Sequence, residues 1–540
     1  MTESSKQLRR IGGGVAILFF FILLAGGILL LPRANSTHMR VGDHEQHAQL
    51  VFERAAGNPL KLRAFLQEMP KGGDLHMHLS GAVYAETFLQ DAIADNFCVD
   101  TATFDLKPGA GPAKSIAAPP VCAAGQQPAE NALKDQKLYD AVIDAFSMRT
   151  FVPKSGIDGH DQFFSTFSRF GMLGKNHAGE WVDEVATRAA AQNEQYLEIM
   201  HTPDFSAAAA AGYAAGWNPN LPAMRDALLA QGIRNSVAEN VAEFDAMDAK
   251  RNQLEHCGTP QAMPACAVTV RYIYQVLRGF PPQQVFAQTL LGFEVASVDP
   301  RVVGINFVMP EDGYVSMNQY HQQMLMLDYL HSVYPSVHIT LHAGELAYEM
   351  VPPAGLRFHI REAIELGHAE RIGHGVDVMY ESDPQGLLKE MRAKHVMVEI
   401  NLTSNDVILG VTGENHPLPI YLAARVPIAL STDDEGVSRI DLTHEYERAV
   451  NDFGFTYLDL KRSARTSLEH SFLPGADLWA TPDKFTHMNG ECDYSPLTPT
   501  TSTCLNFLKS SEKARQEWEL ERRFKEFEAK ESQVVEAYPH

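Results

Sequence analysis

Eight short apolar segments, each near a stretch compatible with a helix, recur along most of the chain. They are Gly73–Leu79, Gln195–His201, Ala267–Val276, Arg301–Pro310, Val337–Glu345, Arg371–Val378, His395–Leu402 and Val426–Asp434. Parallel strands that are buried on both faces need crossover helices, and their sequences are near-continuous apolar runs. The alternation therefore predicts an α/β fold, a (β/α)8 TIM barrel, with a doubly wound open sheet as the alternative.

A wide gap separates the first two predicted strands and contains a Pro-, Gly- and Ala-rich stretch. Such a composition favours turns, so we expect an insertion in the barrel at about residues 98–122. The six cysteines of the chain form three close pairs: Cys98 with Cys122, Cys257 with Cys266, and Cys492 with Cys504. Six cysteines allow fifteen pairings. Because short loops close most readily, we expect a disulfide within each close pair, with six unpaired core thiols as the alternative.

Basic residues Lys6, Arg9 and Arg10 precede a nearly unbroken apolar run from Ile11 to Pro32. A run of about 20 apolar residues can span a bilayer, whereas the apolar part of a cleaved signal peptide usually has about 7–15. The sequence favours a signal anchor over a cleaved signal peptide. Either one predicts an exported protein, periplasmic or extracellular, in which disulfides persist.

This interpretation divides the chain into two parts. Residues 1–40 are the cytoplasmic stub, the anchor or signal peptide, and a linker. Residues 41–540 are the barrel, with its insertion and with additional N- and C-terminal helices. The expected contact with the membrane is through the N-terminal apolar run.

Acidic residues outnumber basic residues by 67 to 45, which gives a formal net charge of -22. A field of this sign repels polyanions, so the composition argues against nucleic acid as a partner. It places little restriction on a small neutral substrate.

Polar side chains lie where several of the predicted strands end, and active sites of parallel barrels form at the C-terminal ends of strands. His76 and His78 are two residues apart in the first strand, so their side chains point the same way. The fifth, sixth and eighth segments carry further polar residues: His342, His374, Asp433 and Asp434. Such groups are costly to bury without partners, and one bound metal ion explains them together.

Imidazole and carboxylate ligands without thiolates favour Zn²⁺, with another divalent transition metal (manganese, iron or cobalt) as the alternative. Binuclear barrel hydrolases commonly bridge two ions through a lysine or carboxylate at the end of the fourth strand. Here that strand ends at Met309 and Pro310, which offer neither group. We therefore expect one ion.

Glu345 comes three residues after His342, in the sequence "HAGE". Ala343 and Gly344 leave space for a substrate next to this carboxyl. A carboxyl group held near a metal and away from bulk water can keep a raised pKa and act as an acid. The alternative is a glutamate favoured by the dipole at the start of a helix.

Four motifs in this order, "MPKGGDLHMHLSGA", "HAGE", "RIGHGVDV" and "STDD", resemble those of the adenosine deaminase family of metal-dependent barrels. The resemblance extends over roughly Met69 to Asp434. The export signal and the insertion after the first strand resemble the secreted branch of that family, the adenosine deaminase-related growth factors.

The resemblance implies one Zn²⁺ ion and hydrolytic deamination of adenosine or 2′-deoxyadenosine to inosine or 2′-deoxyinosine plus ammonia by a metal-activated hydroxide. The implied metal ligands are His76, His78, His342 and Asp433. The implied catalytic residues are Glu345, His374 and Asp433. The implied substrate-binding residues are His78, Ser80, Met309 and Asp434. In this scheme Glu345 protonates the purine, His374 orients the hydroxide and assists proton transfer, and Asp434 holds the imidazole-side nitrogen of the purine.

The sequence departs from the family pattern at three places, which involve four residues. Ser80 stands where typical members place an aspartate for the ribose 5′-hydroxyl, and Met309 stands in place of a glycine whose amide meets the purine. Glu435 and Gly436 follow the aspartate pair in place of a proline-led turn. These differences concern nucleoside recognition and leave the catalytic set intact.

Other functions are compatible with the same barrel. The protein could act on another adenine derivative or hydrolyse a different amide, or it could be a non-catalytic extracellular protein that binds nucleosides or signals. Pseudoenzymes usually lose a metal ligand or the proton donor. All of these residues are present here, which favours an enzyme.

Overall fold

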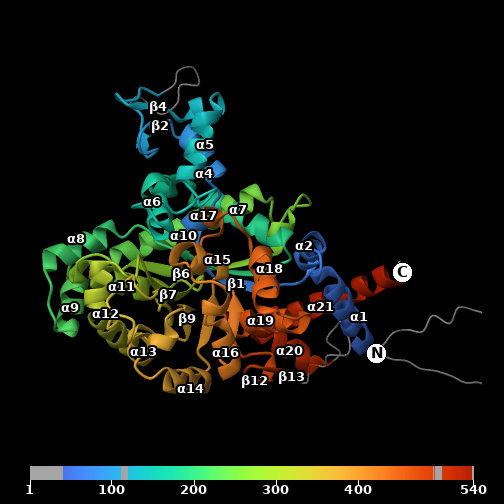
Figure 1. The fold of residues 1–540 in the computed structure, drawn as a ribbon. Coiled ribbons are helices and arrows are strands. Elements are labelled where there is room, and N and C mark those ends of the chain that lie inside the picture. Colours follow the sequence, from blue (N-terminus) through green and yellow to red (C-terminus); the bar gives the residue numbers. More distant parts are fainter. Residues whose placement is uncertain (1–40, 111–119, 491, 493–500, 538–540) are drawn as a thin grey trace, which may run out of the picture. The chain divides into compact units, whose positions relative to one another are not determined.

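A computed structural model describes residues 41–110, 120–490, 492 and 501–537. Eight parallel strands form one sheet in the order β1-β5-β6-β7-β8-β9-β10-β11 (Figure 1). Their bounds are β1 Gly73–His78, β5 Tyr196–His201, β6 Thr269–Leu277, β7 Val302–Val308, β8 His338–Ala343, β9 Arg371–His374, β10 Met397–Ile400 and β11 Ile428–Leu430. Each predicted segment corresponds to one strand, and the predicted (β/α)8 barrel is confirmed.

The barrel closes through the backbone just after β11. The Asp433 N–H donates to the carbonyl of His76 at 2.8 Å, and the His78 N–H donates to the carbonyl of Asp433 at 3.0 Å. Met77 and Asp433 are thereby paired as in a parallel sheet. Because the first and last strands meet in this way, the open-sheet alternative is excluded.

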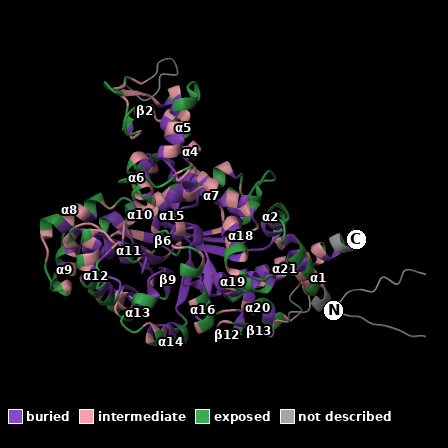
Figure 2. Cartoon of the chain, viewed as in Figure 1, coloured by how far each residue is buried: buried purple, intermediate pink, exposed green. Residues whose placement is uncertain are grey.

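Helices cover the barrel, and the strands inside them are buried (Figure 2). The longer helices between strands are α7 Gly174–Ala191, α8 Ser206–Ala215, α9 Leu221–Ala230, α10 Asn235–Leu254, α11 Pro282–Ala296, α12 Tyr314–Val333, α14 Pro384–Lys394 and α15 Leu402–Leu409. Shorter ones are α3 Leu79–Ala82, α13 His359–Glu365 and α16 Leu418–Ala424. After β11 come α17 Glu435–Ser438, α18 Leu442–Phe453 and α19 Tyr457–Glu469.

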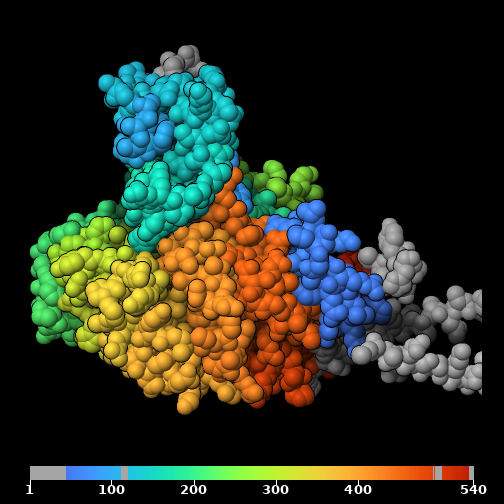
Figure 3. Space-filling view, viewed as in Figure 1, coloured from blue at the N-terminus to red at the C-terminus, as the bar shows by residue number. Residues whose placement is uncertain are grey.

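A small lobe is inserted between β1 and β5. It contains the antiparallel strands β2 Phe97–Asp100, β3 Leu106–Pro108 and β4 Gln126–Pro128, next to helices α4 Ala85–Ala94, α5 Gln136–Ala145 and α6 Gly159–Phe170 (Figure 3, blue to cyan). A disulfide joins Cys98 to Cys122. The sequence predicted a turn-rich insertion. The structure adds a sheet, because Cys98 and Val99 in β2 are apolar and fully buried.

The other two disulfides join Cys257 to Cys266 and Cys492 to Cys504, which confirms the expected pairing. In the described part of the chain, no helix is both long enough and apolar enough to cross a membrane. The apolar run Ile11–Pro32, for which we expect a signal anchor, lies outside the described residues.

The N- and C-terminal helices predicted from the sequence are α1 Val41–Ala56, α2 Pro59–Glu68, α20 Ser502–Ser510 and α21 Glu512–Ala537. Phe527 of α21 contacts Phe65 of α2, with ring centroids 5.1 Å apart, and also Tyr457 of α19, at 6.4 Å. The terminal helix thus packs against helices of the barrel. A hairpin of β12 Trp479–Thr481 and β13 Lys484–Met488 precedes it and was not predicted.

Candidate metal centre and active site

Three histidines and one aspartate from separate segments converge at the C-terminal mouth of the barrel. His76 and His78 end β1, His342 lies near the end of β8, and Asp433 follows β11. The Nε2 of His78 lies 3.1 Å from the Nε2 of His342 and 3.1 Å from the Oδ1 of Asp433. The same Oδ1 lies 3.4 Å from the Nε2 of His76. The structure therefore brings together all four of the predicted metal ligands.

The geometry of these four atoms fits one small divalent ion. Ligand atoms that share a zinc ion at about 2.0–2.2 Å stand roughly 3.3 Å apart. Three of the pairs, His78 with His342 and Asp433 with His76 and with His78, are 3.1 to 3.4 Å apart and match that spacing. The Nε2 of His76 is buried without a hydrogen-bond partner, which is costly unless something else binds it.

The far nitrogen of each ligand histidine faces an oxygen acceptor. The three pairs are His76 Nδ1 with Glu399 Oε2 at 2.7 Å, His78 Nδ1 with Gln275 Oε1 at 2.5 Å, and His342 Nδ1 with Asn306 Oδ1 at 2.8 Å. Each acceptor favours the tautomer with the proton on Nδ1 and leaves the lone pair of Nε2 for a metal. The surrounding residues thus orient the ligands for coordination.

Arg371 and Thr340 hold the side chain of Glu399 in place. Arg371 Nε donates to Glu399 Oε1 at 2.7 Å, and Arg371 also forms an ion pair with Glu198 at 2.6 Å. Thr340 donates to the same Oε1 at 2.9 Å. Burial opposes ionisation of Glu399, but Arg371 and His76 keep its pKa below the ordinary value. A carboxylate is therefore available to His76.

Glycines make room for the polar side chains. A Cβ on Gly373 would lie 2.5 Å from the ring of His76, and a Cβ on Gly81 would lie 1.4 Å from Asp434 Oδ1. Gly344 has φ +73, and a Cβ there would lie 2.4 Å from Asp377. The small residues of "SGA", "HAGE" and "IGHG" are thus required by close packing in the site.

His374 and Glu345 lie beside the four ligands. The Nε2 of His374 is 3.7 Å from Glu345 Oε1 and 3.8 Å from Asp433 Oδ2, and it is buried without a hydrogen-bond partner. Burial lowers the pKa of His374 to about 3. Burial and the nearby charges of Asp433 and Glu311 raise the pKa of Glu345 well above its ordinary value. Burial therefore favours a neutral imidazole on His374 and works against ionisation of Glu345.

The turn that carries Glu345 is fixed by a buried carboxylate that the sequence analysis did not identify. Glu311 accepts the backbone N–H of Gly344 at 3.0 Å and that of Glu345 at 2.7 Å. Burial opposes its ionisation, but His359 and Arg278 lower the pKa of Glu311 to about 2. Glu311 therefore remains charged, with its two oxygens on the backbone that positions Glu345.

Asp434 and the residues after it explain the departure from a proline-led turn. Asp434 Oδ1 is buried without a partner, and burial together with Asp433 raises the pKa of Asp434 well above its ordinary value. Glu435 is buried in an ion pair with Arg188 of α7 at 2.6 Å. A Cβ on Gly436 would lie 2.1 Å from the carbonyl oxygen of Val83. Both residues following the aspartate pair therefore have packing roles.

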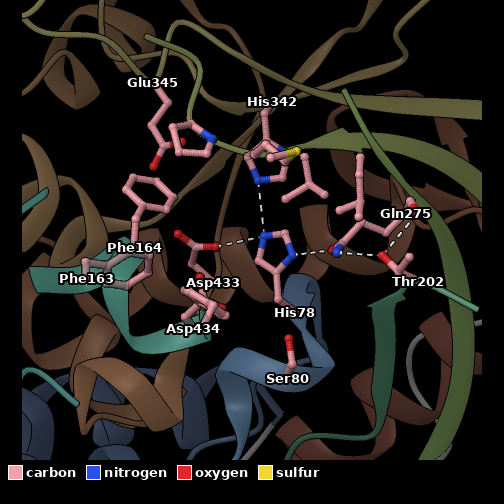
Figure 4. A pocket seen from close by; sticks show the side chains of 15 residues that line it. His78, Ser80, Phe163, Phe164, Thr202, Gln275, His342, Glu345, Asp433 and Asp434 are labelled. Atoms are coloured by element: carbon pink, nitrogen blue, oxygen red, sulfur yellow. Dashed lines mark hydrogen bonds and ion pairs between the residues drawn. The ribbon is translucent and has the colours of Figure 1, made fainter. Parts of the chain in front are cut away.

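A cavity of about 390 Å³ opens at these groups (Figure 4). The predicted residues that line it are His78, Ser80, Met309, His342, Glu345, Asp433 and Asp434. Ser80 lies on the side of His78 away from His342 (Figure 4). Met309 has φ 105, a conformation that favours glycine, and its sulfur accepts the Gly279 N–H at 3.2 Å. The cavity is within the size range of small-molecule sites.

Other residues of the cavity wall were missed by the sequence analysis. They are Phe163, Phe164 and Phe167 of α6, together with Thr202, Gln275, Leu277, Val308 and Pro310. The aromatic cluster in "HDQFFSTFSRF" was a signal for the first three, because its helical spacing puts the rings near one another. Nothing in the sequence indicated that this helix covers the site.

Comparisons with known proteins identify the family of the chain. The family model described as adenosine deaminase matches residues 176–480, which is more than half of the chain. The chain belongs to the adenosine deaminase family. It is 37% identical over 135 residues to an adenosine deaminase of Clostridium perfringens and 37% identical over 140 residues to that of Shewanella loihica.

These matches are partial. The matched segments cover 25% and 26% of this chain and 37% and 39% of the lengths of these two family members. Among solved structures, an N6-mAMP deaminase from arabidopsis aligns over 76% of this chain and 96% of its own, with 20% identity and a TM-score of 0.48. An amidohydrolase from Burkhoderia ambifaria with bound Zn aligns over 76% and 88%, with 17% identity and a TM-score of 0.45.

Proposed function

We propose that this member of the adenosine deaminase family is a zinc-dependent enzyme that converts adenosine or 2′-deoxyadenosine to the corresponding inosine and ammonia. The observation that carries the proposal is the convergence of His76, His78, His342 and Asp433, three pairs of which have donor atoms 3.1 to 3.4 Å apart, beside the buried carboxyl group of Glu345. A structural protein would have no use for this combination at the mouth of a cavity.

His76, His78, His342 and Asp433 would hold the ion. A bound Zn²⁺ acts as a Lewis acid that makes water a nucleophile at neutral pH. Asp433 contributes one oxygen to this set, and its other oxygen accepts a hydrogen bond from Ser404 at 2.6 Å. Burial opposes ionisation of Asp433, but the neighbouring imidazoles of His76, His78 and His374 hold its pKa well below the ordinary value. Asp433 is therefore an anionic ligand at any physiological pH.

Two acidic side chains, Glu345 and Asp434, contact different nitrogens of the purine. Glu345 donates its proton to the ring nitrogen next to the amine-bearing carbon, which makes that carbon more electrophilic. The oxygen of water then adds to the carbon, and one proton of that water returns to Glu345. The bond to the exocyclic amine breaks, and the amine takes the second proton of the water and leaves as ammonia. Asp434, also protonated because its pKa is raised, donates its O–H to the imidazole-side nitrogen of the purine.

The aromatic face of α6 excludes water from the reaction. Phe163, Phe164 and Phe167 line the cavity, and Phe163 and Phe164 lie on the same side as Glu345 and Asp433 (Figure 4). A purine ring stacks favourably on such side chains, and removal of water strengthens the interactions with Glu345 and Asp434.

The charge of the cavity favours a neutral nucleoside over a nucleotide. None of the residues that line this cavity in the described part of the chain is a lysine or an arginine, and the chain has a formal net charge of -22. A phosphate group would meet no counter-charge and would be costly to bury. Ser80 provides a neutral hydroxyl suited to a sugar hydroxyl.

The export of the protein remains a proposal as well. Three disulfides among the described residues support an oxidising compartment. We propose that residues 1–40 direct the chain to the periplasm or the extracellular space, and that residues 41–540 form the catalytic barrel there.

The test is a substrate panel with the purified full chain. Ammonia release is measured with adenosine, 2′-deoxyadenosine, adenine, methylthioadenosine and AMP, before and after treatment with a chelator. We expect kcat/KM for adenosine or 2′-deoxyadenosine to exceed that for AMP by about 100-fold or more, since a buried phosphate would lack a partner. Release of ammonia from none of these compounds would contradict the proposal, and a preference for AMP would contradict the choice of substrate.

A further inference from the structure

The fourth histidine of the site has different neighbours from the three ligand histidines. His374 ends β9 with φ 70, and its Nδ1 faces two amide groups, Asn405 Nδ2 at 2.9 Å and Asn401 Nδ2 at 3.4 Å. Its Nε2 points toward the reaction site, between Glu345 and Asp433. Which nitrogen carries the proton decides whether His374 can donate or accept a hydrogen bond there.

A backbone amide fixes the direction of the hydrogen bonds that lead to His374. The Leu418 N–H donates to His416 Nδ1 at 3.1 Å, and a backbone N–H can only donate. His416 is therefore neutral, with its proton on Nε2, which lies 3.0 Å from Asn405 Oδ1. Because that oxygen accepts from His416, the amide nitrogen of Asn405 donates to His374 Nδ1. An accepting Nδ1 leaves the proton of His374 on Nε2.

The hydrogen bond at Nδ1 of His342 runs in the opposite direction. Asn306 Nδ2 donates to the carbonyl oxygen of Thr340 at 3.1 Å, and a carbonyl can only accept. The oxygen of Asn306 therefore faces His342 Nδ1, which carries the proton and leaves a lone pair on Nε2. Asn306 therefore orients His342 as a metal ligand. Asn405, with its amide nitrogen toward the imidazole, leaves His374 as a hydrogen-bond donor.

We propose that Asn405 and His416 are positioning residues that hold His374 in the Nε2–H tautomer, so that His374 donates a hydrogen bond to the oxygen attacking the purine. This inference rests on the proposed function and narrows it. An Nε2 that already carries a proton can neither bind the ion nor act as the base. The proton that water loses then goes to a carboxylate, and Glu345 can take it after protonating the purine.

The first test reads the tautomer directly. Nitrogen-15 NMR of histidine-labelled full chain distinguishes protonated from unprotonated ring nitrogens, and a His374→Gln spectrum identifies the signals of His374. We expect His374 to be protonated on Nε2 in both chelator-treated and zinc-loaded protein. A proton on Nδ1 would overturn the proposal.

The second test reverses the direction of the hydrogen bond between residue 405 and Nδ1 of His374. Asn405→Asp replaces the donating amide with an oxygen of nearly the same shape, and it still accepts from His416. We expect the proton of His374 to move to Nδ1 and kcat to fall by about 100-fold, with zinc content unchanged and KM within about threefold. A moved proton with unchanged kcat would contradict the role of donor.

A matched pair at the next residue keeps the proposal testable if Asn405→Asp does not fold. His416→Gln can still accept from the Leu418 N–H and donate to Asn405, so it should retain the tautomer and most of kcat. His416→Phe can do neither and should lose both. Equal kcat in the two folded variants would count against the proposal. If the wild-type chain shows the Nε2–H tautomer but releases no ammonia, the proposed function fails and the tautomer assignment stands.

Discussion

The two ends of the barrel both gather histidines and carboxylates around a cavity, but the donors are arranged differently. At the C-terminal mouth, the Nε2 of His78 lies 3.1 Å from the Nε2 of His342 and 3.1 Å from one oxygen of Asp433. At the N-terminal end, His395 and His470 bond to two different oxygens of Asp483, at 2.6 and 2.9 Å.

The N-terminal cavity is the larger of the two, about 750 Å³ against about 390 Å³. Its size and its histidines do not give it the geometry of the mouth, because His395 and His470 bond to two different oxygens of Asp483, and His338 and His368 bond to Glu370 and Asp328. Asp483 instead ties the β12–β13 hairpin to the barrel. Convergence of free lone pairs on one point, more than residue type, distinguishes a metal site from a structural cluster.

Replacing one histidine at each end gives the largest expected difference. His342→Asn should lose the bound zinc and reduce kcat by about 1000-fold or more, since a ligand and its orientation are removed. His470→Asn should keep one zinc per chain and kcat within about threefold. Metal analysis and ammonia assays on both variants check this, and loss of zinc from His470→Asn would break the comparison.

Glu345→Gln separates proton donation from metal binding at the mouth. We expect kcat to fall by roughly 1000-fold, because an amide cannot supply the proton, while zinc content and thermal stability stay as in the wild type. Full activity of this variant would rule out the proposed role of Glu345.

Glu311→Gln tests the buried support of the same turn. One of its two accepting oxygens becomes a donor, which clashes with the N–H of Gly344 or Glu345 and shifts the acid. A misplacement of this kind costs about 100-fold in kcat. Steady-state kinetics with a zinc measurement check this. An unchanged kcat would mean that Glu311 is not needed to position Glu345.

The smallest expected effect lies at the N-terminal end and concerns stability. Burial raises the pKa of Glu469 to about 8, against about 4.3 in an unfolded chain. The folded state therefore binds this proton more tightly, and the free energy of unfolding falls as pH rises from about 4.5 to about 8. Between about pH 5 and pH 9, the Tm of the Glu469→Gln variant should fall less than the Tm of the wild type. The exposed Glu414→Gln is the control, and an identical pH dependence in all three proteins would contradict the prediction.

Much of this molecule could be predicted from its sequence. The apolar runs located all eight barrel strands, because strands buried on both faces tolerate few polar residues. The histidines and aspartates at strand ends stood out for the same reason. Placement of the strands in a closed barrel then brought His76, His78, His342 and Asp433 together.

The supporting residues could not be found in this way. Glu399 and Gln275 lie inside strands, where a polar residue has no local signature of its partner. Asn405 and His416 lie in a helix and a loop, and their role depends on a chain of bonds that ends at the backbone of Leu418. Phe163 reaches the cavity only because α6 folds over the barrel. Contacts of this kind depend on tertiary packing and leave no periodic pattern.

The backbone pairing that closes the barrel between β1 and the segment after β11 affects thermal stability. Asp433 closes the barrel through its backbone and reaches the neighbouring imidazoles through its side chain. Local opening of this pairing would separate two segments that carry proposed metal ligands. Tight binding of the ion and stability of the closed barrel therefore depend on the same contacts. If the proposed ion is bound here, we expect heat inactivation to begin with its loss where β11 and β1 meet.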